Sequence, residues 1–109
     1  MEIKMAKLKS KGNGDCIKIA CEMIIENKEF LFCYAHVMGR EKLKGQRILH
    51  AWNEIGDVVF DYSNGNKVTM RKEKYYKLAK IKEKSVIKQT SKEVIELLFE
   101  TKTYGGWIK

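Results

Sequence analysis

The sequence predicts an α+β fold in which an N-terminal helix, carrying a cysteine at its start, packs on an antiparallel sheet. Residues 17–25 and 91–101 place apolar side chains at helical spacing. Residues 29–39, 46–55 and 57–63 are rich in the β-branched and aromatic residues that favour strands. A helix followed by strands that are joined by short turns favours one sheet with a helix on its face.

The length and composition favour one domain that spans residues 1–109. The chain has no proline and no Gly/Ser-rich tract that would mark a linker. Its apolar runs are shorter than the about 18 residues of a membrane span. The basic N-terminus is not followed by the apolar stretch of a secretory signal. We therefore expect a cytoplasmic protein with no membrane association.

The first predicted helix follows a turn at "GNGD" (12–15), where glycine and asparagine tolerate left-handed backbone conformations. Residues 2–9, before it, fit either a short strand or an arm. Asp15 is suited to cap a helix that begins at Cys16, and we expect the helix to end near Asn27. Its apolar face is formed by Ile17, Ala20, Cys21, Ile24 and Ile25.

The predicted sheet is built around a hairpin. Residues 29–39 are too apolar for a surface strand and are expected to lie inside the sheet, followed by a loop over 40–45. The strands "QRILHAWNEI" (46–55) and "DVVFDYS" (57–63) meet at Gly56-Asp57, a common hairpin turn. A turn at 64–66 leads into residues 67–70.

The second half of the chain alternates helical and extended patterns. Residues 71–80 are predicted to be helical, with Tyr75, Leu78 and Ala79 on one side, and 85–89 form a last strand. Thr90 and Glu93 form a capping box that opens the helix over 91–101. The segment "YGGWIK" (104–109) is expected to form an irregular tail.

Three cysteines, without CxxC spacing or a companion histidine cluster, favour neither a disulfide framework nor structural zinc. We therefore predict no metal site and no cofactor. Cys21 and Cys33 lie within apolar faces and are expected to be packing residues. Cys16 differs, because the N-terminus of a helix favours the thiolate, the nucleophilic form of cysteine.

His50 and Asp61 are the predicted partners of Cys16. In a hairpin that closes at Gly56-Asp57 they become direct or diagonal neighbours across the strand pair. A carboxylate on one ring nitrogen would orient the imidazole, so that the other nitrogen can take the thiol proton. His36 is the rival base, but the predicted hairpin places no carboxylate opposite it.

The segments "GDC" at a helix start, then "HAWNE", then a turn and "VVFDYS" (58–63) together resemble the transglutaminase-like branch of the papain-like cysteine enzymes. The resemblance covers about residues 12–65. It implies a minimal papain/transglutaminase-like core and a catalytic triad of Cys16, His50 and Asp61. Trp52 and Ser63 would be flanking motif residues, and we assign Trp52 to substrate binding.

The chemistry that the resemblance implies is thiolate attack on an amide or ester carbonyl, through a thioester, on a peptide or acyl-amide substrate. The oxyanion would be held by the backbone N–H of Cys16 and by the side chain of Asn13. The chain departs from the family in its small size. It also has Gly14-Asp15 where many members place an apolar or aromatic residue beside the cysteine.

The rival functions rest on charge. Residues 71–88 hold eight basic and two acidic side chains, much of the net +8 of the chain, together with Tyr75 and Tyr76. Basic and aromatic residues can contact phosphates and stack on bases, so this segment could bind nucleic acid. Alternatively, a catalytically silent relative would use it to hold an acidic protein partner.

Overall fold

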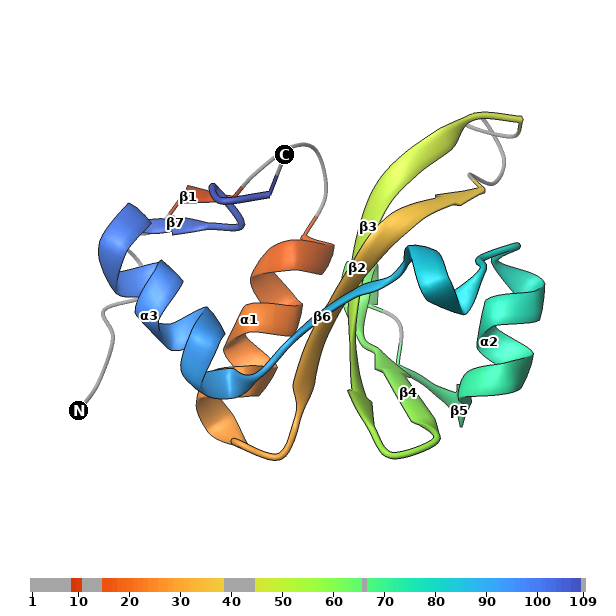
Figure 1. The fold of residues 1–109 in the computed structure, drawn as a ribbon, viewed down its shortest axis with the longest axis horizontal. Helices are drawn as coiled ribbons and strands as arrows, with labels where there is room; N and C mark the ends of the chain where they lie inside the picture. The colour runs from red at the N-terminus through yellow and green to blue at the C-terminus, as the bar shows by residue number, and fades with distance from the viewer. Residues whose placement is uncertain (1–8, 11–14, 39–44, 66, 109) are drawn as a thin grey trace.

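A computed structural model of the chain describes residues 9–10, 15–38, 45–65 and 67–108, and over these residues the fold is α+β, as predicted (Figure 1). The helices are α1 (Cys16–Glu26), α2 (Lys72–Leu78) and α3 (Ser91–Thr101), and short 3₁₀ turns are η3 (Ser63–Gly65) and η4 (Glu83–Ser85). The strands are β1 (Lys9–Ser10), β2 (Leu31–Met38), β3 (Arg47–Ile55), β4 (Val58–Asp61), β5 (Val68–Arg71), β6 (Ile87–Gln89) and β7 (Thr103–Tyr104).

Five of these strands form an antiparallel sheet in the order β5-β4-β3-β2-β6. In Figure 1, α1 and α3 lie on one side of this sheet and α2 on the other. Each side has its own apolar cluster. The first joins α1 and α3 to Phe32 and Ala51. The second joins Tyr75 and Tyr76 of α2 to Cys33 and Trp52.

Helix α1 begins at Cys16 and is capped at its end by Asn27, close to the predicted bounds. Asp15 occupies the N-cap position, but its side chain makes no capping hydrogen bond. The buried face of α1 packs across β3 and β2. Asn53 fixes this packing, because its side-chain amide donates to the carbonyl oxygens of Ala20 (3.0 Å) and Leu31 (3.1 Å).

The β3–β4 hairpin closes as predicted, with Gly56 at φ +55° in the turn. The register pairs Ile55 with Val58 and continues to Asn53 with Phe60, where the pairing between β3 and β4 ends. Pairing of β3 with β2 continues six residues further, to Met38 with Arg47. The first half of β3 therefore extends beyond β4.

One local prediction was wrong. In α2 the buried residues are the adjacent Tyr75 and Tyr76, whereas Leu78 is 53% exposed, because α2 is short and presents neighbouring positions to the sheet. The tail is irregular over residues 105–108, as predicted, but Tyr104 belongs to β7, which pairs in parallel with β1. The predictions for residues 2–8, 12–14 and 40–44 lie outside the described residues.

The remaining elements agree with the sequence patterns. The capping box of Thr90 and Glu93 is present, and α3 spans Ser91–Thr101 as predicted. Strand β2 lies inside the sheet, between β3 and β6. In the described part of the chain, no helix has the length and apolar character needed to cross a membrane.

Candidate active site

Cys16 is the first residue of α1 and lies beside β3. Its side chain is hydrogen-bonded to the side chain of His50 and to the backbone of Ala51, so it lies where β3 continues past the end of β4. Cys16 is partly exposed. The first amides of a helix have no intrahelical acceptor, and their partial positive charge favours an anion at this position.

His50 connects Cys16 to Asp61. Its Nε2 lies 2.7 Å from Oδ2 of Asp61, so Nδ1 is the ring nitrogen left for Cys16. Asp61 follows Phe60, the last residue of β4 that pairs with β3, so the register continued by one position sets Asp61 opposite Trp52 and diagonal to His50, on the same face of the sheet. The side chains of His50 and Asp61 keep 17% and 14% of their surface exposed. The structure thus brings the three predicted residues together.

Asp61 is held by two further side chains. Ser63 donates its hydroxyl to Oδ1 of Asp61 at 2.8 Å. Tyr75 donates its hydroxyl to Oδ2 at 2.7 Å, the same oxygen that His50 contacts. A carboxylate that accepts several hydrogen bonds is stabilised in its charged form and fixed in orientation. Asp61 can therefore orient His50 without itself taking up a proton.

The surroundings of the three groups favour charge on each of them. Burial opposes ionisation of Cys16, but the hydrogen bond and the charge of His50 outweigh it and lower the pKa of the thiol. Burial also disfavours the imidazolium, yet the hydrogen bonds to Asp61 and Cys16 raise the pKa of His50 to about 9. Asp61 is likewise partly buried, but the hydrogen bond and charge of His50 lower its pKa to about 2. These shifts favour a thiolate–imidazolium pair over a neutral thiol beside a neutral imidazole.

Trp52 is only 1% exposed, which contradicts its prediction as a substrate-binding residue. Its ring stacks on the imidazole of His50, with ring centroids 6.1 Å apart and planes at 25°. Its Nε1–H donates to Oε2 of Glu54 at 2.8 Å. Trp52 is thus a buried, hydrogen-bonded ring that packs beside His50.

His36, Cys21 and Cys33 lie apart from Cys16, His50 and Asp61. His36 is exposed on β2, on the face opposite to that of His50. Cys21 and Cys33 are fully buried, and burial raises the pKa of Cys21 to about 12 and that of Cys33 still further. Asn13, the predicted oxyanion donor, lies outside the described residues.

Sequence reasoning missed the roles of Tyr75 and Glu54. Tyr75 was predicted as a packing residue or a base-stacking residue, and its contact with Asp61 spans 14 positions of the chain. Glu54 reads as the polar end of a strand, yet it is 1% exposed. It accepts hydrogen bonds from Trp52 and Tyr76 and pairs with Lys88 at 3.2 Å. No local pattern signals either contact.

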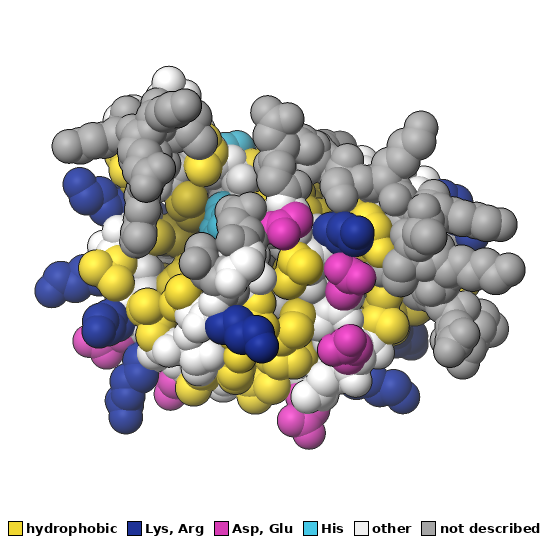
Figure 2. All heavy atoms as spheres, turned by 180° about the vertical axis from the view of Figure 1, so that it is seen from behind, with side chains coloured by type: hydrophobic (Ala, Val, Ile, Leu, Met, Phe, Trp, Pro, Cys, Tyr) yellow, Lys and Arg dark blue, Asp and Glu magenta, His cyan; other side chains and the backbone are white. Residues whose placement is uncertain are grey.

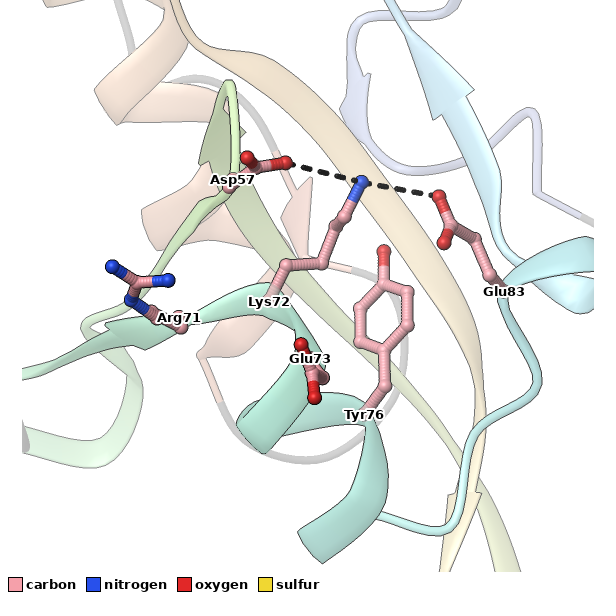
Figure 3. A pocket seen from close by; sticks show the side chains of 6 residues that line it. All are labelled: Asp57, Arg71, Lys72, Glu73, Tyr76 and Glu83. Carbon is pink, nitrogen blue, oxygen red and sulfur yellow. Dashed lines mark hydrogen bonds and ion pairs between the residues drawn. The ribbon is translucent and has the colours of Figure 1, made fainter.

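A separate pocket lies between α2 and η4 (Figure 3). Lys72 extends between Asp57 (3.9 Å) and Glu83 (3.1 Å), so the charges in this pocket largely neutralise one another. None of the three predicted catalytic residues lines it. Among the described residues, no group of His, Cys, Asp and Glu side chains is placed to hold a metal ion.

The basic segment 71–88 has an exposed, charged surface with no exposed tyrosine. Its exposed basic side chains are Arg71, Lys74, Lys77, Lys80, Lys82 and Lys84. Figure 2, the view from behind, shows basic side chains projecting at the edge of the molecule where α2 lies. Tyr75 and Tyr76 are buried and donate to carboxylates, so neither ring is presented for base stacking.

Comparison of the chain with protein-family models, with curated proteins and with solved structures gave no match.

Proposed function

We propose that this protein is a cysteine-dependent acyl hydrolase or acyltransferase of the transglutaminase-like kind. The observation that carries the proposal is the hydrogen-bonded series Cys16–His50–Asp61, with the thiol at a helix N-terminus and partly exposed. A nucleophile, a base within hydrogen-bond reach and a third group that orients the base are the parts that thiol acyl chemistry requires.

The first half of the reaction forms a thioester. The Cys16 thiolate attacks the carbonyl carbon of an amide or ester, and a C–S bond forms while the carbonyl oxygen becomes an oxyanion. The backbone N–H of Cys16, which has no intrahelical acceptor, is placed to donate to that oxygen. Collapse of the adduct breaks the C–N or C–O bond, and the imidazolium of His50 gives its proton to the leaving group.

The second half releases the acyl group. Water or an amine gives a proton to the neutral imidazole of His50 and attacks the thioester carbon, which expels the Cys16 thiolate and restores the ion pair. Attack by water completes hydrolysis, and attack by an amine completes acyl transfer. The proposed substrate is a peptide or another acyl amide. The cytoplasmic location expected from the sequence stays a prediction.

The test is the rate at which iodoacetamide alkylates each cysteine as a function of pH, followed by peptide mass spectrometry. In the unaltered protein, Cys16 should reach its plateau rate near pH 6–7, whereas an ordinary thiol ionises near pH 8.5. His50→Ala should move the Cys16 profile up toward that value and slow alkylation at pH 6 by roughly 10- to 100-fold.

Controls come from the same chain. Cys21 and Cys33 should stay unreactive in the folded protein, because burial raises their pKa values. His36→Ala, which removes the exposed histidine on the other face of the sheet, should leave the Cys16 profile unchanged. A Cys16 profile centred near pH 8.5 in both the unaltered protein and His50→Ala would contradict the proposal.

The alternative is a catalytically silent binding module that uses the basic segment 71–88. Six basic side chains of that segment are exposed, which favours an acidic protein over nucleic acid because the tyrosines are buried. Such a module would bind its partner equally well in Cys16→Ala. Its affinity would also fall with added salt.

A further inference from the structure

The hydroxyl of Tyr75 and the imidazole of His50 compete for one carboxylate oxygen. Both lie 2.7 Å from Oδ2 of Asp61. The donors to the other oxygen come from Ser63, through its hydroxyl at 2.8 Å and its backbone N–H at 3.4 Å. Of the two hydroxyl groups that donate to Asp61, that of Tyr75 shares an oxygen with His50, whereas that of Ser63 does not.

The placement of Tyr75 is well defined. Its side chain comes from α2, and only 8% of the residue is exposed. Its ring packs against Trp52, with centroids 5.3 Å apart, and Trp52 in turn stacks on His50. Packing thus fixes the ring and directs the hydroxyl to the carboxylate. The effect of the hydroxyl can therefore be measured apart from the effect of the phenol ring.

We infer that Tyr75 is a positioning residue that tunes the base, because its hydroxyl draws electron density from the oxygen of Asp61 that holds His50. A donor that competes for a carboxylate oxygen weakens the hold of that oxygen on the imidazolium. The His50 proton is then easier to release. The consequence for catalysis rests on the proposed function, in which the imidazolium must protonate the leaving group.

Three ionisable groups face His50 and could contribute to its titration. They are Cys16 from α1, Asp61 from β4 and, through Asp61, Tyr75 from α2. Removal of the Tyr75 hydroxyl leaves Cys16 and Asp61 in place. Asp61 stays ionised above pH 5, because its pKa of about 2 lies far below that range. A change in the titration of His50 then reports the hydroxyl.

The experiment is an NMR titration of the imidazole Hε1 signals in the unaltered protein, Tyr75→Phe and Ser63→Ala. The chain has two histidines, so His50→Ala assigns the signals and His36 serves as an internal reference. Tyr75→Phe should raise the pKa of His50 by about half a unit or more. Ser63→Ala, the matched control on the other oxygen, should raise it by less.

A second replacement separates tuning from loss of structure. Tyr75→Met also lacks the hydroxyl and should give the same upward shift as Tyr75→Phe, in a protein whose NMR spectrum remains folded. A loosened site would instead weaken the Asp61–His50 contact and lower the pKa of His50. An unchanged or lowered value, or a shift no larger than that in Ser63→Ala, would overturn the inference.

This titration needs no substrate, so its failure and that of the proposed function can be told apart. An ordinary reactivity of Cys16 with an upward shift of the His50 pKa would reject the enzyme and keep the role of Tyr75. An activated Cys16 with no such shift would keep the enzyme and reject the role of Tyr75.

Discussion

Two carboxylates of the β3–β4 hairpin, Asp61 and Glu54, are largely buried and differ in one important respect. Asp61 is joined by Tyr75 and, through the imidazole of His50, by Cys16. Glu54 is joined by Tyr76 and by the side chains of Lys88, Trp52 and Cys33. Each cluster thus contains a cysteine, a carboxylate and one of two adjacent tyrosines of α2.

The difference between the clusters lies in what stands between thiol and carboxylate. At Cys16 an imidazole intervenes, and its positive charge lowers the thiol pKa against the effect of burial. At Cys33, burial and direct contact with the negative Glu54 raise the thiol pKa. A carboxylate beside a thiol therefore suppresses the thiolate. Asp61 favours the thiolate only indirectly, because it stabilises the His50 imidazolium, while its own charge raises the pKa of Cys16.

Removal of Glu54 should produce the largest loss of stability. Glu54→Ala leaves three buried or half-buried donors, on Trp52, Tyr76 and Lys88, without their acceptor. Each buried donor left without its acceptor typically costs about 1–3 kcal/mol, so the losses at Trp52 and Tyr76 together should be large. Urea unfolding should measure this loss, while Cys16 in the folded fraction keeps its early alkylation plateau. A shift of the Cys16 alkylation profile in folded Glu54→Ala would instead show that the Glu54 cluster and the Asp61 cluster are coupled.

Asp61→Asn should lower the stability less than Glu54→Ala does, but it should greatly lower the reactivity of Cys16. The folded pKa of Asp61 lies nearly two units below its ordinary value, which corresponds to about 2–3 kcal/mol. Without the carboxylate, the imidazolium loses its partner, so Cys16 should be alkylated as an ordinary thiol. Alkylation and urea unfolding of the same variant measure both effects.

The stability difference between the unaltered protein and Asp61→Asn should depend on pH. The pKa of Asp61 is lowered, so its contribution is present above about pH 4 and is lost as pH falls through about 2. The pKa of His50 is raised, so its contribution is complete below about 6.5 and is lost as pH rises through about 9. The difference should therefore be largest between about pH 4 and 6.5, and a flat profile would contradict the pairing.

Lys88→Met should have the smallest effect. The ammonium of Lys88 is partly exposed, and its pairs with Glu54 and Glu83 should contribute about 1 kcal/mol. Burial opposes the charge of Lys88, but Glu54 raises its pKa above the ordinary 10.5, so the contribution is complete at neutral pH. Urea unfolding at pH 7 should show a small loss and an unchanged Cys16 profile. A loss as large as that of Glu54→Ala would show that Lys88 alone keeps Glu54 in the core.

The parts that could be predicted from sequence are those set by short-range rules. The start of α1 at Cys16, the hairpin turn at Gly56 and the capping box of α3 each follow from a few adjacent residues. The hairpin register in turn fixes the diagonal relation between His50 and Asp61. These elements bring two of the three proposed catalytic residues together without any knowledge of the rest of the fold.

The parts that could not be predicted depend on contacts between distant segments. Tyr75 meets Asp61, and Tyr76 meets Glu54 across 22 positions, only after α2 has packed on the sheet. Helical periodicity places Leu78 on the same face as Tyr75. In the packed structure, α2 instead buries the adjacent Tyr75 and Tyr76 and leaves Leu78 exposed. The burial of Trp52 likewise comes from α2, so a motif residue that appeared to face a substrate proved to be a buried ring beside the histidine.

The stacking of Trp52 on His50 gives the molecule an internal optical reporter. An imidazolium that lies against an indole ring is a cation beside an electron-rich surface, and its charge alters the emission of that ring. The chain has only two tryptophans, so Trp107→Phe would leave Trp52 as the sole indole. Its fluorescence would then report the protonation of His50 without a label.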